Sequence, residues 1–512
     1  MRTVVVTGDP LTVEDVVDVA RGDANAVLSD DVAARMEPSR RVVAQAVDGD
    51  AVVYGVTTGF GALADTSVGS EQLAQMQLSL IRSHAAAVGD PLPDEHVRGL
   101  LLLRARTLAA GYSGVRVDLP TQLLSLLGHG LMPVIPERGS VGASGDLAQL
   151  AHLALPLVGE GRLRQQGSAD LTGQPAPILL DRAGIAPLTL APKEGLSLLN
   201  GTEPMQVLLA LSVVDAELLV RAADVACALS VECLLGTDRT YDERVQALRP
   251  HPGQRASAAN LRTLLAGSPL LASHRDSHHA VQDAYCLRCA PQVHGAVRDV
   301  LTHVRRVLET ELGSVVDNPV VIDGDVLTTG NFHGEPLAFA ADMLAIALAE
   351  IGSISERRVD RMLDPAFSRG LPPFLAPDAG VNSGYMLAQY TAASIVSENK
   401  VLTHPASVDT IPTSGNQEDH VSMGWGAVRK LRDVVAGIRS VLAVELVCAA
   451  QAIDLRADIA GPAAATAAVH NRLRADVPWM DVDREVASQL AAADRLLPDL
   501  VAAAESVAGP LL

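Results

Sequence analysis

Long stretches of the chain repeat apolar residues at the spacing of an α-helix. The run over 202–235 has no internal glycine, carries its one proline, Pro204, in the first turn, and stops at Gly236. Proline fits the first turn of a helix and glycine ends one, so this run predicts a single helix of about 50 Å. Comparable runs predict further long helices over 281–312, which Pro291 and Gly295 interrupt, over 336–361 and over 424–456.

The first two hundred residues are more broken than the rest. They predict helices over 71–84 and 98–110 and short β-like segments at 4–6 and 52–56. From Gly461 the chain is rich in alanine and again helical. Several of the long runs are apolar on more than one side, as expected of helices buried between other helices or between subunits.

This pattern predicts a mainly α protein, with a long-helix central bundle and a smaller mixed N-terminal region. The regions expected are a mixed N-terminal part at 1–200, the bundle at 201–460, and C-terminal helices packed on it at 461–512.

Composition narrows the class of protein. The 512 residues are 48% hydrophobic and carry a formal net charge of −20. So acidic a chain is unsuited to nucleic acid or to an anionic membrane surface. The N-terminus lacks a signal-like apolar run, and no run of 18 apolar residues occurs, so a cytoplasmic protein is expected. Cys286 and Cys289 form a C-x-x-C without a second ligand pair, and no metal site is predicted.

The segment at 139–148, GSVGASGDLA, can build an electrophile from its own backbone. The Gly145 amide nitrogen, which no Cβ crowds, can attack the Ala143 carbonyl and close a five-membered ring. Loss of one water from the ring, and of the Ser144 hydroxyl as a second, leaves an exocyclic methylidene. Such tripeptides also occur by chance in a glycine-rich chain. The plain alternative is a loop with Asp146 as the N-cap of a helix.

Aromatic residues make up only 3% of the chain, so an aromatic residue in a polar context is conspicuous. Tyr54 lies among glycines, which indicates either a mobile loop that brings a phenol to a ligand or an ordinary turn. His84 ends a predicted helix and could simply interact with its C-terminus. Asn200 lies just before the long helix that begins near Thr202, where an amide could meet a ligand or merely precede an N-cap.

Three later segments add candidates. Tyr285 and Arg288, which follow Gln282, are one helical turn apart and could serve a substrate as phenol and carboxylate partner, or simply stack at the surface. Phe332 lies among polar residues and glycines. Glu418 lies in a stretch dense in titratable groups, which fits either a solvated loop or a carboxylate for a basic ligand.

Taken together, these segments resemble the methylidene-imidazolone family of aromatic amino acid ammonia-lyases and aminomutases, and within it the histidine ammonia-lyases. The similarity runs in the family's order along most of the chain. The matching segments are YGVTTGFG at 54–61, SHAA at 83–86, GSVGASGDLA at 139–148, KEGLSLLNGT at 193–202, RPHPGQ at 249–254, VQDAYCLRCAPQV at 281–293, SVVDNPV at 314–320, GNFHG at 330–334, SENK at 397–400 and QEDHVSMG at 417–424.

The resemblance implies a helical architecture like that of fumarase and aspartase. It implies a homotetramer whose active sites each draw on three subunits. It further implies that Ala143-Ser144-Gly145 cyclises autocatalytically to 4-methylidene-imidazol-5-one, with no external cofactor or required metal. The expected reaction is elimination of ammonia from L-histidine to give trans-urocanate.

Carried over by position, the resemblance assigns a role to each candidate. Tyr54, Tyr285 and Glu418 remain alternatives for the base that removes the β-proton, and either the amine or the imidazole could bond to the electrophile. Arg288 is expected to bind the substrate carboxylate, and Asn200 and Tyr285 are expected to lie near the prosthetic ring. His84 and Glu418 would face the imidazole or its reacting end. Gln282 and Phe332 would complete the wall of the site.

Two rival functions follow from the same scaffold. A tyrosine or phenylalanine ammonia-lyase or aminomutase is disfavoured by His84 and Glu418, which a phenyl ring would leave unpaired. A non-catalytic helical scaffold is disfavoured by the intact tripeptide. Small departures from the family occur at Glu203, where many relatives have Gln, at Cys286 and at Gly415. Glu203 places a charge near Asn200, which bears on the role of that amide.

Overall fold

A computed structural model describes residues 2–49, 53–59, 61, 68–142, 146–277 and 280–512. The chain is mainly helical, as predicted. Its contacts form two compact units. Unit 1 comprises Met1–Leu211, Arg305–Ala341 and Pro405–Arg429, and unit 2 comprises Ser212–Val304, Asp342–His404 and Lys430–Leu512.

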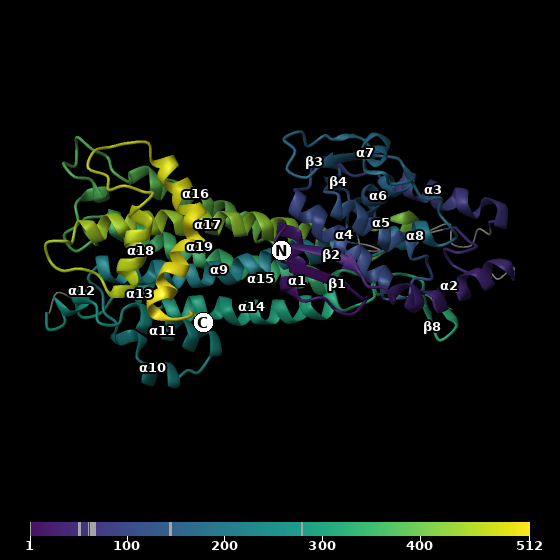
Figure 1. Ribbon diagram of the computed structural model, residues 1–512. Coiled ribbons are helices and arrows are strands. Elements are labelled where there is room, and N and C mark those ends of the chain that lie inside the picture. Colours follow the sequence, from purple (N-terminus) through teal and green to yellow (C-terminus); the bar gives the residue numbers. More distant parts are fainter. Residues whose placement is uncertain (1, 50–52, 60, 62–67, 143–145, 278–279) are drawn as a thin grey trace. The chain divides into compact units, whose positions relative to one another are not determined.

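The long helices predicted from periodicity are present (Figure 1). They are α9 (Glu203–Cys233), α14 (Ala290–Leu312), α15 (Glu335–Leu363) and α17 (Gly424–Asp454), and each contains residues of both units. By length and composition α15 could cross a membrane, but 61% of its apolar window is buried inside the protein. Such burial is typical of a core helix.

The expectation of one interrupted helix over 281–312 was wrong in detail. Residues 281–284 are not helical, and Tyr285–Arg288 forms a separate short helix, α13. Pro291 is the second residue of α14, where its missing N–H costs no helical hydrogen bond. Gly295 lies inside α14 and does not break it. A glycine is needed there because the backbone of Gln254 comes so close that a Cβ would collide with it.

Unit 1 combines shorter helices with small sheets. Its sheets are a parallel pair β1–β2, an antiparallel pair β3–β5, an antiparallel sheet β4-β6-β7 and a hairpin β8–β9. The elements are β1 (Arg2–Val6), α1 (Val13–Arg21), β2 (Ala24–Leu28), α2 (Val32–Asp48), α3 (Leu73–His84), β3 (Val88–Pro91), α4 (Asp94–Ala109), α5 (Asp118–Gly128), β4 (Leu131–Pro133), β5 (Pro136–Arg138), α6 (Leu147–Ala154), β6 (Arg162–Gln165), β7 (Gln174–Pro175), α7 (Ala176–Ala183), α8 (Glu194–Leu199), β8 (Val320–Ile322) and β9 (Asp325–Leu327).

The predicted β-like segment at 52–56 is not a strand where it is described. Val56 and Thr57 both donate backbone hydrogen bonds to the carbonyl oxygen of Val53, at 3.1 and 3.0 Å, which makes a turn. Gly55 has a φ of 67°, a left-handed conformation that glycine adopts freely. Val53 and Val56 therefore belong to a turn, which a short hydrophobic run cannot distinguish from a strand.

Unit 2 contains the remaining helices, which are α10 (Glu243–Ala247), α11 (Pro252–Leu264), α12 (Pro269–Ala272), α13, α16 (Met386–Leu402), α18 (Ala464–Arg474) and α19 (Val486–Ala508). At its core, Arg358 of α15 and Glu445 of α17 form a fully buried ion pair. Glu445 also accepts hydrogen bonds from Ser230 at 2.6 Å and Ser355 at 2.5 Å. Burial acts to lower the pKa of Arg358, but the charge and hydrogen bonds of Glu445, together with the nearby Cys227 and Cys286, raise that pKa overall.

Candidate active site

Ala143, Ser144 and Gly145 lie outside the described residues, but both flanks of the tripeptide are described. The carbonyl oxygen of Val141 accepts a hydrogen bond from the Met423 amide at 2.9 Å. The carbonyl oxygen of Gly142 accepts one from the Ser422 hydroxyl at 3.2 Å. On the other side, the Asp146 amide donates to the carbonyl oxygen of Gly201 at 3.0 Å. The residues on either side of the tripeptide are therefore held by segments far away in the sequence.

Gly142 requires glycine for two independent reasons. Its φ of 71° is left-handed, which residues with a side chain rarely adopt. A Cβ at this position would also collide with the hydroxyl oxygen of Ser422. The glycine thus allows Ser422 to lie against the backbone just before the tripeptide.

Asp146 precedes α6 as predicted, but its carboxylate does not cap that helix. It instead accepts hydrogen bonds from the Ser140 hydroxyl at 2.5 Å and from the Met205 amide, at the start of α9, at 3.2 Å. The residue is fully buried. Burial raises the pKa of Asp146 to about 7, against the opposing effect of the two hydrogen bonds, while the nearby Glu203 charge adds to the increase.

Asn200 is buried at the C-terminus of α8. Its backbone oxygen accepts a hydrogen bond from Arg104 at 2.8 Å, and its side-chain nitrogen donates to the carbonyl oxygen of Asn318 at 3.3 Å. The side-chain oxygen is buried and has no hydrogen-bond partner among the described residues. A buried unpaired amide oxygen costs free energy unless a ligand or a further group satisfies it.

A buried ion pair supports this asparagine. Arg104 and Glu203, both fully buried, lie 3.1 Å apart. Burial raises the pKa of Glu203, and the guanidinium of Arg104 opposes that rise. The carboxylate of Glu203 is thus paired with Arg104, the same arginine that donates to the Asn200 backbone.

His84 and Glu418 lie in the same part of unit 1 although they are far apart in the sequence. A ring nitrogen of His84, at the end of α3, lies 2.9 Å from the carbonyl oxygen of Leu80. Burial lowers the pKa of His84, whereas the Leu80 carbonyl and the charge of Glu418 act to raise it. Glu418 is itself held by a 2.9 Å hydrogen bond from the Thr413 hydroxyl. A half-buried imidazole and a carboxylate therefore share one region.

The Tyr54 loop approaches the same region. The amide of Gly61 donates to the Tyr54 hydroxyl at 3.3 Å. Gly61 itself lies so close to Ser414 that a Cβ would collide with the serine hydroxyl. Since Ser414 precedes Glu418 by a few residues, the phenol-bearing loop and the Glu418 segment are neighbours.

Phe332 is half-buried in the loop before α15. Gly334, two residues later, is buried against the side chain of Met205, with Ser422 close by. The structure therefore brings the Phe332 segment beside the residues that fix the tripeptide.

The three remaining candidates belong to unit 2. Gln282 is exposed, and Tyr285 is 72% exposed. The guanidinium carbon of Arg288 lies 4.8 Å from the centre of the Tyr285 ring. Arg288 also donates to the carbonyl oxygen of Asp283 at 3.3 Å. The two residues thus form the stacked pair that the sequence allowed, with the guanidinium only partly buried.

Buried groups position α13, which carries that pair. Arg358 donates to the carbonyl oxygen of Cys286 at 3.2 Å, and Tyr241 donates to that of Leu287 at 2.8 Å. The ion pair at the core of unit 2 therefore reaches the backbone next to Tyr285.

Several residues of the site were not predicted. The roles of Ser422 and of the Arg358–Glu445 pair had no local signal, because they depend on contacts between distant segments. Asp146 was assigned only as a cap, although an acidic residue directly after the tripeptide was a visible signal.

The chain was compared with known proteins. The aromatic amino acid lyase family matches residues 11–475. A protein named histidine ammonia-lyase from Streptomyces avermitilis is 50% identical over 515 residues, which covers all of both chains.

Solved structures agree with this match. The crystal structure of histidine ammonia-lyase from Trypanosoma cruzi aligns with a TM-score of 0.90 and 41% identity, covering 100% of this chain and 96% of that one. That of tyrosine aminomutase from Streptomyces globisporus aligns with a TM-score of 0.92 and 36% identity, covering 98% of each. The chain therefore belongs to the aromatic amino acid lyase family.

Proposed function

We propose that this protein is a histidine ammonia-lyase, which eliminates ammonia from L-histidine and releases trans-urocanate. The observation that carries the proposal is that His84 and Glu418 lie in one region of unit 1, where the charge of Glu418 acts to raise the pKa of His84 against the effect of burial. An imidazole substrate has one nitrogen that donates and one that accepts, so it can hydrogen-bond to groups of both kinds, whereas a phenyl ring offers neither residue a hydrogen bond. Relatives that are about half identical over the whole chain and carry this name support the choice.

The fold by itself does not separate a lyase from an aminomutase, because solved structures of both kinds align closely with this chain. The distinction therefore rests on the substrate-facing residues and on sequence identity, both of which favour histidine.

The residues around the tripeptide fit the prosthetic group that its cyclisation would form. The residues that flank the tripeptide are held on both sides by hydrogen bonds, and the buried Asn200 side-chain oxygen has no partner within the described part of the chain. Once formed from Ala143, Ser144 and Gly145, 4-methylidene-imidazol-5-one would supply an electrophile that no ordinary side chain provides. Asn200 and the Gly142 backbone would hold it, and the function would need no external cofactor.

Side chains of the protein would bind the substrate and remove its β-proton. Arg288 is assigned to the substrate carboxylate, since a planar guanidinium can bind it through two hydrogen bonds. His84 and Glu418 bind the imidazole, and Phe332 and Gln282 complete the wall. The β-proton passes to Tyr54, Tyr285 or Glu418, each of which could serve as a positioned base.

The active form is proposed to be a homotetramer in the cytoplasm, with sites shared between subunits. Tyr285 and Gln282 are largely exposed in the single chain, although each has a role at the substrate. On α15, Phe339, Met343 and Ile346 follow helical spacing and are 50%, 42% and 47% exposed. An apolar stripe of this kind is typical of a surface that another subunit covers.

The test is to incubate the purified protein with L-histidine and follow urocanate by ultraviolet absorbance. L-Tyrosine and L-phenylalanine serve as comparison substrates, and chromatography checks for β-amino acid products. We expect urocanate from histidine and far slower reactions with the others. Faster turnover of tyrosine or phenylalanine, or a β-amino acid product, would contradict the assignment. Sedimentation of the same sample should show a tetramer, and a fully active monomer would exclude shared sites.

A further inference from the structure

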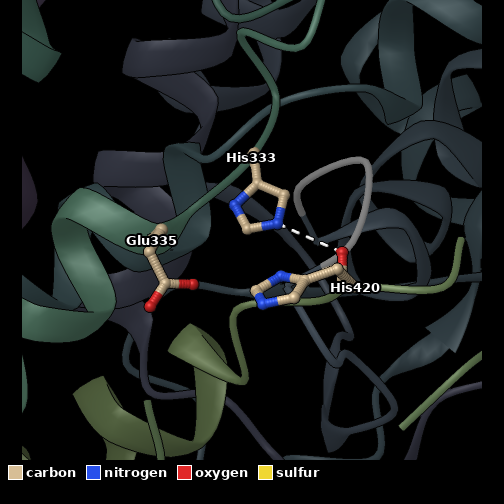
Figure 2. Close-up of side chains that lie close together, drawn as sticks. All are labelled: His333, Glu335 and His420. Carbon is tan, nitrogen blue, oxygen red and sulfur yellow. Dashed lines mark hydrogen bonds between the residues drawn. The ribbon is translucent and has the colours of Figure 1, made fainter. Parts of the chain in front are cut away.

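Three side chains of unit 1 with no role in the proposed reaction lie close together. His333 comes just before α15, Glu335 is the first residue of that helix, and His420 lies in the segment that leads to α17. One potential ligand atom from each, two imidazole nitrogens and a carboxylate oxygen, lies within 4.8 Å of the others. Figure 2 shows the Glu335 carboxylate directed toward the space beside the two imidazole rings.

A hydrogen bond from one ring nitrogen, Nε2, orients the imidazole of His333. The Nε2 atom lies 3.2 Å from the backbone carbonyl oxygen of His420, and because a carbonyl only accepts, Nε2 must carry the proton in this contact (Figure 2). Nδ1 is then the nitrogen with a free lone pair, and it lies on the side of Glu335 (Figure 2). Metal-binding histidines are commonly fixed in this way, with the second nitrogen donating to a carbonyl.

A second observation points to a missing partner. The Oε2 atom of Glu335 is buried and has no hydrogen-bond partner among the described residues. The start of a helix is a favourable place for a carboxylate, but that alone leaves this oxygen unsatisfied. A cation bound between the rings and the carboxylate would satisfy it.

We propose that His333, Glu335 and His420 form a binding site for a divalent transition metal, with zinc as the ion that fits best. Two imidazole nitrogens and one carboxylate oxygen are a ligand set that zinc takes readily, and water can complete a tetrahedron. Zinc–ligand bonds of about 2.0–2.2 Å place tetrahedral ligand atoms roughly 3.3 Å apart, so the three side chains must close slightly. His420 is exposed and free to turn toward the others.

The site would strengthen a junction rather than supply chemistry. The two segments already pack together, because Gly334 lies close to Ser422. A metal shared by His333 and His420 would cross-link the loop that carries Phe332 to the segment that carries Glu418. Ammonia elimination itself would not need the ion, so the metal site and the proposed function can be tested separately.

Zinc binding tests the proposal directly. The full-length protein, freed of any affinity tag, is stripped with EDTA, desalted and equilibrated with zinc in the absence of histidine, since free histidine chelates the ion. We expect one zinc per chain by elemental analysis and a higher melting temperature. Cobalt should give the visible absorption of a tetrahedral N/O site. Binding should weaken as pH falls, because protons compete for the imidazole nitrogens.

Variants separate this site from adventitious binding. His420→Ala and Glu335→Gln should each weaken zinc affinity by more than roughly 100-fold, beyond the range typical of outer partners. His129→Ala, at an exposed histidine elsewhere in unit 1, and Cys289→Ser, in the C-x-x-C, should bind zinc like the wild type. Absence of zinc binding, or binding that persists in His420→Ala and Glu335→Gln, would overturn the proposal. Urocanate formation by EDTA-treated protein is measured separately and tests only the proposed lyase function.

Discussion

The hydroxyl of Ser422 donates a 3.2 Å hydrogen bond to the carbonyl oxygen of Gly142, across 280 positions of sequence. With the bond from the Met423 amide to Val141, it ties the turn before Ala143 to the segment that follows Glu418. The peptide that would become the electrophile and the carboxylate that would face the substrate are therefore anchored by one short stretch of chain.

Cyclisation of the tripeptide would leave a chemical mark on the protein. The mature chain should be lighter than its sequence by two waters, and the loss should map to the peptide that contains Ala143, Ser144 and Gly145. Ser144→Ala has no side-chain hydroxyl to lose, so it should lack the methylidene and nearly all activity. Intact-mass and peptide mass spectrometry check this. An active preparation with the unmodified mass would rule out the self-made electrophile.

Asp146 should make stability depend on pH. Its pKa of about 7 in the folded protein lies above the ordinary value of 3.8, so the folded state holds a proton that the unfolded state has released. The contribution is fully present below the ordinary pKa and is lost as pH rises through about 7, with an upper limit of about 4 kcal/mol.

Asp146→Asn tests this contribution, because the amide cannot ionise and still accepts one hydrogen bond. Between pH 5 and 8 the melting temperature of the wild type should fall more steeply than that of the variant. Parallel melting curves for the two proteins would show that Asp146 does not titrate in this range.

The base that removes the β-proton can be identified by comparing three substitutions, Tyr54→Phe, Tyr285→Phe and Glu418→Gln. Loss of a general base costs about 10²–10⁴-fold in kcat and removes the limb of the pH profile that the base controls. Loss of a binding contact alone costs about ten- to a hundred-fold and keeps that limb. Tyr112→Phe, at a tyrosine without an assigned role, is the control. Equal, small losses for all three variants would mean that the proton goes to a different group.

Arg288→Lys should weaken catalysis although it keeps the charge. Loss of bidentate carboxylate binding is worth roughly 1.5–3 kcal/mol, or about ten- to a hundred-fold in kcat/KM. The defect should shrink for histamine, which has no carboxylate, if it binds. Arg361→Lys is a matched control, since Arg361 also stacks on an aromatic ring, that of Phe367, at 4.9 Å. Unchanged histidine affinity in Arg288→Lys would place the carboxylate elsewhere, with His84 as the next candidate.

Glu445→Gln should destabilise the protein strongly, because it leaves Arg358 charged and buried. Breaking a buried ion pair costs about 3–5 kcal/mol. Glu37→Gln removes the exposed pair with Arg41 and should cost at most about 0.5 kcal/mol. Thermal unfolding compares the two variants. Because Arg358 also holds the Cys286 backbone, folded Glu445→Gln should bind histidine less tightly. Similar melting temperatures for the two variants would contradict the importance of the buried pair.

The long helices could be predicted because each depends on local sequence. A continuous apolar run with Pro204 at its start and Gly236 beyond its end specifies α9 without any knowledge of its neighbours. Gly295 could not be interpreted in this way, since its role depends on the approach of Gln254 from another helix. Val56 could not be interpreted from local sequence either, because it is buried in a turn rather than in a strand.

The candidate site could be predicted as a set of residues but not as an arrangement. The motifs identified His84 and Glu418, yet nothing local indicates that one affects the pKa of the other. The local sequence predicted that the Asp146 side chain caps a helix. In the structure this side chain accepts hydrogen bonds from Ser140 and Met205 instead. The roles of the site residues and the three regional boundaries stay predictions.

The hydrogen bonds that hold the residues flanking 143–145 bear on when the electrophile can form. The bonds to Val141, Gly142 and Asp146 come from segments that reach them only once unit 1 has folded. Fixing the backbone of a single residue costs about 1–2 kcal/mol, so the flanks are held in place only when the folded segments supply these bonds. If the tripeptide cyclises as proposed, newly made protein would fold first and become an enzyme afterwards. Activity would then lag behind the appearance of folded protein, and chains that never fold would keep their two waters.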